Sequence, residues 1–261
     1  MLILIQFLLR ATFGMAGAMA WISPKQVTSG YYRNHLYVLL GFNVLTSLVA
    51  YSHRNECEFV TPIMAAGLCY VGAICWLYEK PRAGIISLVG VAGVALAGLL
   101  LPHFGSAIEG AETKMTAVTK LPLQNVLRVF DPISGGLVLG VTLAAMFLGH
   151  WYLNTPTMKM APLKKLVVGM GIAIGLRTVV CGVGLAMTFQ YADPHQLSIW
   201  FVLLRWLAGI AGALGVVWMT WETLKIPNTQ SATGILYVGV IVTFIGELAS
   251  VLMSSTLPYP I

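Results

Sequence analysis

Four charged side chains stand inside long apolar stretches of the chain. The stretch GIAIGLRTVVCG, residues 171–182, is one example. The four are Arg10, Arg177, Arg205 and Glu247. A charge at the centre of a lipid bilayer costs about 2.5–3.5 kcal/mol on insertion scales unless it is paired or hydrated. Three arginines and one glutamate therefore predict a buried binding site with an excess of positive charge.

The guanidinium group limits what such a site would bind. Its planar fork of N–H donors matches carboxylates and phosphates, and it also donates to a carbonyl oxygen. Haem propionates, a lipid phosphate, an anionic small molecule or a quinone carbonyl all fit this chemistry. In the simpler interpretation Glu247 pairs with one arginine to hold two helices together, and backbone carbonyls and water satisfy the others.

Helical spacing predicts that two of the arginines share a face with glycines. LLRATFGMAGA from residue 8 and LLRWLAGIAGA from residue 203 both match LLR-x3-G-x-AGA, which is either an internal repeat or a chance match. In each stretch the glycines follow the arginine at i+4 and i+7, on the same helical face. Thr243, Glu247, Ser250 and Ser254 form a polar stripe at similar spacing. These patterns predict that the charges face the interior of a helix bundle.

Histidines offer a second kind of site. Haem b in a membrane bundle is commonly held by imidazoles, and His35 and His150 would form such a pair if their helices were neighbours. Otherwise His150, beside Trp151, is an interfacial side chain. A metal site is not assigned, because the remaining candidates are scattered without a close motif: His53, His103, His195 and Cys57.

Composition indicates the elements that position these residues. Of the 261 residues 58% are hydrophobic and 9% are charged, whereas about 25% are charged in soluble domains. A span needs roughly 20 apolar residues. We therefore expect an all-α fold, a polytopic membrane helix bundle with one integral-membrane domain over 1–261 and an interfacial segment over about 104–131. The expected spans are 1–22, 35–52, 59–78, 83–102, 133–153, 166–190, 197–221 and 232–254.

The distribution of charge predicts the orientation in the membrane. Lys and Arg gather in the odd-numbered connections, and acidic residues in the even-numbered ones. Because cytoplasmic loops are enriched in Lys and Arg, we expect both termini on the outer, periplasmic side of a bacterial inner membrane. The charges give no basic run or basic–aromatic patch, which argues against nucleic acid as a partner.

Catalytic fingerprints such as a P-loop, H-E-x-x-H or G-x-S-x-G are absent from the sequence, so a non-catalytic subunit is favoured over a self-contained enzyme. The first functional hypothesis is a membrane subunit of an electron-transfer or respiratory assembly that binds a quinone or haem and works with partner subunits. In architecture alone it resembles the quinone-interacting anchor subunits of the NrfD type. The alternatives are a small-anion permease with a basic pocket, and a structural or assembly subunit whose charges only orient helices.

Overall fold

The computed structural model describes residues 2–52, 56–113, 121–155, 157–191, 198–226, 228–254, 257 and 259–261. Regular structure in this part of the chain is entirely helical. Eight of its helical segments are long and apolar enough to cross a membrane. The chain is therefore an integral, multi-pass membrane protein with the helical bundle that its composition predicts. The helices are α1 (Leu2–Trp21), α2 (Ser29–Ser52), α3 (Glu56–Leu77), α4 (Pro81–Thr113), α5 (Leu121–Asn154), α6 (Ala161–Tyr191), α7 (Ile199–Leu203), the π-helical η2 (Leu204–Gly212), α8 (Ala213–Lys225) and α9 (Thr229–Ser254).

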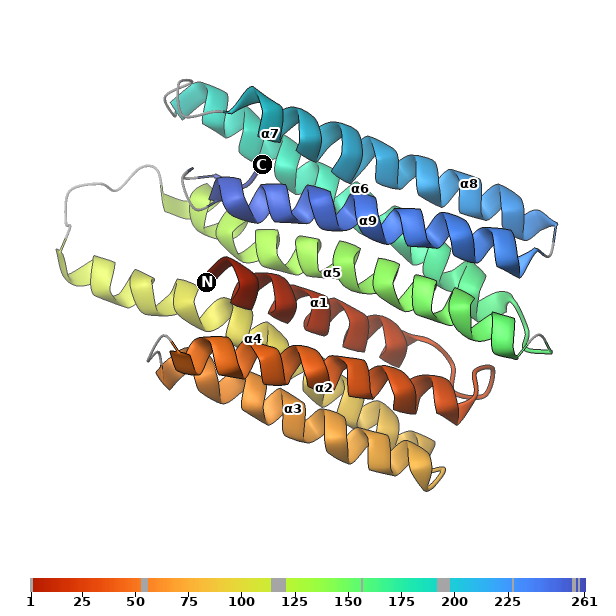
Figure 1. The fold of residues 1–261 in the computed structure, drawn as a ribbon. Helices are drawn as coiled ribbons and strands as arrows, with labels where there is room; N and C mark the ends of the chain where they lie inside the picture. Colours follow the sequence, from red (N-terminus) through yellow and green to blue (C-terminus); the bar gives the residue numbers. More distant parts are fainter. Residues whose placement is uncertain are drawn as a thin grey trace.

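Helix α5 lies in the middle of the bundle, where it packs against α1, α6 and α9 (Figure 1). On one side of it α1 packs against α2 and α4, and α3 packs against α2 and α4. On the other side η2 and α8 pack against α9. Segments α7, η2 and α8 follow one another as a single crossing, Ile199–Lys225. The bundle thus has two groups of helices, α1–α4 and α5–α9, which meet mainly where α1 lies on α5.

One end of the bundle has basic connections. The connections after α1, α3, α5 and α8 lie at the end opposite to the chain termini (Figure 1). We call this the basic end, because its connections contain Lys25, Lys80 and Lys159. There the Lys165 ammonium lies 4.3 Å from the centre of the Trp21 ring. A tryptophan at such a boundary is typical of the membrane–water interface.

The course of α4 and α5 differs from the expected interfacial segment over 104–131. Helix α4 continues to Thr113 and α5 begins at Leu121, so both extend into that range. Pro132 lies inside α5, and the chain before it is already helical. A proline lacks an N–H donor and is tolerated mainly in the first turn of a helix, yet α5 begins at Leu121, well before both Pro132 and the expected span of 133–153. In the structure the preceding residue, Asp131, is a buried part of α5.

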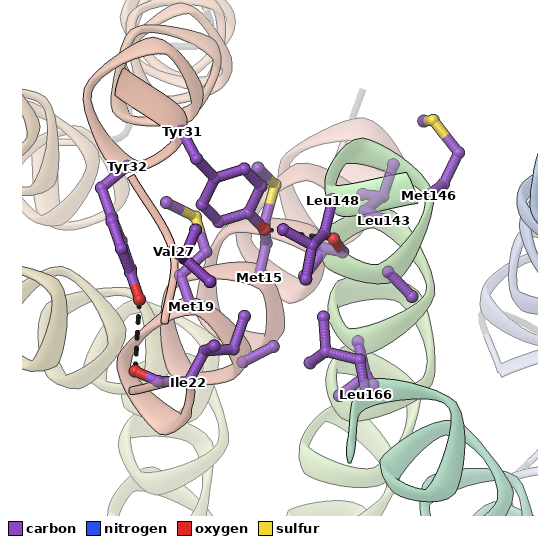
Figure 2. Close-up of a cluster of buried hydrophobic side chains, with 14 of the residues drawn as sticks. Met15, Met19, Ile22, Val27, Tyr31, Tyr32, Leu143, Met146, Leu148 and Leu166 are labelled. Carbon is purple, nitrogen blue, oxygen red and sulfur yellow. Dashed lines mark hydrogen bonds between the residues drawn. The ribbon is translucent and has the colours of Figure 1, made fainter. Parts of the chain in front are cut away.

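A large apolar core fills the basic end (Figure 2). Two of its tyrosines donate to backbone carbonyls: the Tyr31 hydroxyl donates to Ala144 O on α5 at 3.1 Å, and the Tyr32 hydroxyl donates to Ile22 O, just after α1, at 3.2 Å. The Tyr32 ring also stacks on Trp76 with 4.0 Å between centroids. The two hydrogen bonds satisfy the buried hydroxyl groups of Tyr31 and Tyr32, which usually find a partner in a core.

Close contact between α1 and α5 depends on glycine. A Cβ atom on Gly14 would overlap the carbonyl oxygen of Gly136, and one on Gly140 would overlap the backbone of Gly14. Small residues allow membrane helices to approach until their backbones touch. This contact brings the two groups of helices together one turn away from Arg10.

Candidate functional site

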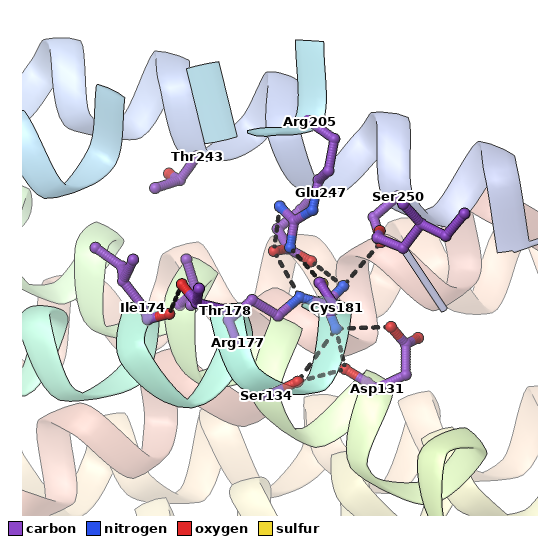
Figure 3. A network of polar contacts seen from close by, with 12 residues as sticks. Asp131, Ser134, Ile174, Arg177, Thr178, Cys181, Arg205, Thr243, Glu247 and Ser250 are labelled. Carbon is purple, nitrogen blue, oxygen red and sulfur yellow. Dashed lines mark hydrogen bonds and ion pairs between the residues drawn. The ribbon is translucent and has the colours of Figure 1, made fainter. Parts of the chain in front are cut away.

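Arg177, near the middle of α6, lies at the centre of a buried network of charges (Figure 3). Its Nε donates to Glu247 Oε1 at 3.0 Å, and its Nη2 donates to Glu247 Oε2 at 2.9 Å and to Ser250 Oγ at 3.0 Å. Its Nη1 donates to Asp131 Oδ1 at 2.6 Å and to Ser134 Oγ at 3.1 Å. Every nitrogen of this guanidinium therefore has an acceptor, although the side chain is only 1% exposed.

Glu247 joins all three predicted arginines. Besides its two bonds with Arg177, its Oε1 lies 2.9 Å from Arg205 Nη1 and its Oε2 lies 3.8 Å from Arg10 Nη1. The four charged residues predicted as a site thus come together, from α1, α6, η2 and α9. The carboxylate is completely buried, so its charge is compensated by these ion pairs and not by water.

Asp131 supplies a second carboxylate that sequence reasoning missed. Its Oδ2 accepts from Arg10 Nη2 at 2.5 Å, and its Oδ1 accepts from Arg177. The expectation that Glu247 alone faces three arginines is therefore corrected. A signal for it was present: Asp131, Ser134 and Gly135 have the i, i+3, i+4 spacing of one helical face. It was hidden because Asp131 was assigned to a connection between spans.

Glycines allow the network to pack without space for larger side chains. A Cβ on Gly135 would lie 2.6 Å from Glu247 Oε2 and 2.9 Å from Arg10 Nη1. A Cβ on Gly209 would lie 2.6 Å from the Cα of Gly246 and 3.0 Å from Arg205 Nη1. The small residues on α5, η2 and α9 therefore let the guanidinium groups reach the carboxylates.

The network is not fully compensated. Within the described residues three arginines face two carboxylates, which leaves one excess positive charge. Arg10 Nε, Arg10 Nη1 and Arg205 Nε have no hydrogen-bond acceptor in this part of the chain. A buried donor without a partner costs about 1–3 kcal/mol, and more when it is charged. An additional acceptor at these atoms would lower the free energy of the site.

Arg205 has a special backbone setting. It lies in η2, a π-helical segment of nine residues, and its Nη2 contacts Cys181 Sγ at 3.2 Å. Hydrogen bonds of the i→i+5 type are rare and occur frequently at functional sites. Within this segment Arg205 and Gly209 both contact residues of α9, Glu247 and Gly246.

A groove lies between α1 and α9, the helices that also carry Arg10 and Glu247. It has a volume of about 410 Å³ and is lined by residues of α1 and α9: Ile3, Leu4, Phe7, Phe244, Ile245 and Leu248. The Phe7 and Phe244 rings meet edge to face, with centroids 5.1 Å apart. Each phenylalanine lies three residues from a member of the network, Phe7 from Arg10 and Phe244 from Glu247. Because residues at i and i+3 share a helical face, the groove and the network occupy neighbouring parts of the same two helices.

The two histidines predicted as a haem pair have separate surroundings. The buried His35 ring packs against Tyr31, Phe147 and Trp151, and its Nδ1 lies 2.6 Å from Tyr31 O. The exposed His150 has its Nδ1 3.2 Å from the Tyr237 hydroxyl on α9. The helices α2 and α5 do touch. The two imidazoles are close enough to interact electrostatically, and their role as ligands stays a prediction.

Metal binding has no support in the described residues, where no three His, Cys, Asp or Glu side chains form a group that could hold an ion. His53 and His195 and the side chains of Cys57 and His103 lie outside the described residues.

Comparison with known proteins gives no relationship: no family model, no curated protein and no solved structure matches the chain.

Proposed function

We propose that the protein is an integral-membrane subunit of an electron-transfer assembly and binds a quinone beside its buried charge network. The observation that carries this proposal is the one excess positive charge, with unpartnered N–H groups on Arg10, on a helix that also lines an apolar groove. A quinone needs both features, because it has a polar ring with carbonyl oxygens and a long apolar tail.

Each part of the site has a role in this proposal. The quinone enters from the lipid, and its tail lies along the apolar surface of α1 and α9. The ring packs against Phe7 and Phe244, and one carbonyl oxygen accepts a hydrogen bond from Arg10. The excess positive charge favours the anionic, reduced forms of the quinone over the neutral oxidised form, since opposite charges attract strongly where water is excluded. Partner subunits deliver or remove the electrons.

A quinone is proposed in preference to haem because of the histidine surroundings. A haem held by His35 and His150 would need both imidazoles on one iron, but the buried His35 ring is packed against the rings of Tyr31, Phe147 and Trp151, whereas His150 is exposed. The charge network, by contrast, offers hydrogen-bond donors that a carbonyl oxygen uses directly.

The test is to purify the protein from its native membrane, extract it with organic solvent and measure isoprenoid quinone per chain, beside a reduced-minus-oxidised visible spectrum. We expect quinone in a fixed ratio to the protein. Ile245→Trp, which fills the groove, should abolish retention, and Arg10→Gln should weaken it. Ile241→Trp is the matched control, because Ile241 is an exposed residue of α9 outside the groove. Haem bands would instead support the histidine pair.

A small-anion permease is the second candidate, favoured by the π-helical segment at Arg205. Such a segment would let Arg205 and the Gly209–Gly246 contact rearrange as an anion passes. A preparation without quinone, together with anion-dependent thermal stabilisation that Arg205→Lys removes, would favour this function over the first.

A further inference from the structure

A second groove lies at the basic end, far from the charge network. It has a volume of about 500 Å³ and is formed by the α1–α2 connection and the first turns of α4, which meet at that end of the bundle (Figure 1). Its lining residues are Pro24, Lys25, Pro81, Arg82, Ile85 and Ile86. Neither the electron-transfer proposal nor its alternatives use this groove.

The groove has two cations that other groups leave available. Lys25 and Arg82 are both exposed, and within the described part of the chain neither is in an ion pair. Glu79 in the α3–α4 connection is outside the lining and pairs with neither of them. By comparison, Lys225 at the same end is already paired with Glu222 at 2.6 Å. The two free cations therefore favour an anionic occupant.

The apolar part of the groove continues along α4 into the membrane-spanning surface. Ile86 is 72% exposed and Val89 is 58% exposed, and Arg82, Ile86 and Val89 have the i, i+4, i+7 spacing of one helical face. Gly93 continues that face and has open space beside its Cα. A cation at the interface above an apolar strip matches an amphiphile with an anionic head and hydrocarbon chains.

We infer that this groove binds an anionic glycerophospholipid, with its phosphate between Lys25 and Arg82 and an acyl chain along Ile86 and Val89. Basic pockets between transmembrane helices recognise such head groups, and the Lys165–Trp21 pair at the same end indicates the level of the interface. The acyl contact distinguishes this lipid from free phosphate, which would use only the cations.

The test is native mass spectrometry of the intact protein in mild detergent, titrated separately with phosphatidylglycerol, phosphatidylcholine and inorganic phosphate. We expect retention of phosphatidylglycerol above both other probes. The double variant Lys25→Gln/Arg82→Gln should weaken that retention by about 10- to 30-fold. Each Lys or Arg near an anionic lipid surface contributes about 1 kcal/mol to binding, and about 1.4 kcal/mol corresponds to a tenfold change in affinity. Ile86→Ser should weaken retention of the lipid and leave the response to phosphate unchanged.

The matched control is Lys159→Gln/Lys164→Gln, which removes the same charge at the same end outside the groove. Equal loss in the two double variants would overturn the inference and indicate general surface attraction. Equal retention of phosphatidylcholine, or competition by inorganic phosphate at the concentration of the lipid, would also overturn it. All the substituted side chains except Lys164, which is half-buried, are exposed. Circular dichroism and gel filtration confirm that each variant is folded.

Discussion

The two LLR-x3-G stretches share a sequence pattern but differ in backbone conformation. In α1, Arg10 reaches Asp131 at 2.5 Å and Glu247 at 3.8 Å, and Gly14 lies against α5. In η2, Arg205 reaches Glu247 at 2.9 Å, and Gly209 lies against α9. Both stretches therefore present an arginine to Glu247 and, one turn later, a glycine to the backbone of a neighbouring helix.

The difference between them is in how the arginine is satisfied. Arg10 makes one close ion pair and leaves two nitrogens without an acceptor, whereas Arg205 uses both Nη atoms and leaves only Nε. The α1 stretch keeps regular α-helical turns, and the second stretch becomes π-helical. A shared motif thus gives one arginine with two unpartnered nitrogens and one arginine with a single unpartnered nitrogen.

Removing the common partner should have the largest effect. In Glu247→Gln the three arginines keep only Asp131 as a carboxylate, so we expect a loss of about 3–5 kcal/mol in the free energy of unfolding. Denaturation in detergent micelles, followed by tryptophan fluorescence, measures this loss. Glu222→Gln is the control, because its exposed pair with Lys225 contributes at most about 1 kcal/mol. Equal losses in the two variants would show that burial does not strengthen the network.

The α1 glycine comes next. Gly14→Ala places a methyl group on the carbonyl oxygen of Gly136, and a backbone atom cannot move away as a side-chain tip can. We expect a loss of about 3 kcal/mol, at the upper end for overpacking, measured by the same denaturation. Gly17→Ala is the matched control in the same helix, since nothing lies within 4 Å of its Cβ position. It should be neutral or stabilise by up to about 1 kcal/mol.

The η2 glycine should show a smaller loss. In Gly209→Ala the new methyl group would lie 2.6 Å from the Cα of Gly246, a less severe overlap than at Gly14. We expect about 1–2 kcal/mol, compared with Gly215→Ala, whose Cβ position has nothing within 4 Å. If Gly209→Ala costs more than Gly14→Ala, the two stretches do not rank as their contacts indicate.

The smallest effect distinguishes the two arginines themselves. Lysine has a single ammonium group, so it can preserve one contact of an arginine but not two contacts that point in different directions. Arg205→Lys loses either Glu247 or Cys181, while Arg10→Lys can keep Asp131. We expect Arg205→Lys to be the less stable variant by about 1 kcal/mol, the net value of one hydrogen bond, in paired denaturation curves. The reverse order would remove the asymmetry inferred for the two stretches.

Local spacing predicted much of the network. Arg10 with Gly14, and Glu247 with Ser250, share helical faces at i+3 or i+4, and an α-helix fixes such neighbours whatever its surroundings. The cost of charge in lipid then requires those faces to point inward. Both arguments need only the residues of one helix, and both agree with the contacts of these residues.

Residue spacing within one helix did not predict the π-helical backbone of η2 or the role of Asp131. The two LLR-x3-G stretches have the same residues at the matched positions, yet the first is α-helical and the second is π-helical. To predict the role of Asp131, one must know that α5 begins well before Pro132 and that α1 and α6 both pack against α5.

The sequence by itself determined that the chain has eight helical segments able to cross a membrane and that the few charges within those segments face the interior of the bundle. Composition and helical period are local quantities, and lipid penalises any exposed charge or backbone group. Only the tertiary structure decided which charges meet. Arg10 and Asp131 are 121 positions apart in the chain, and their pairing depends on which helices are neighbours. That arrangement follows from shape, such as the contact of Gly14 with Gly136, and not from any pattern within a single helix.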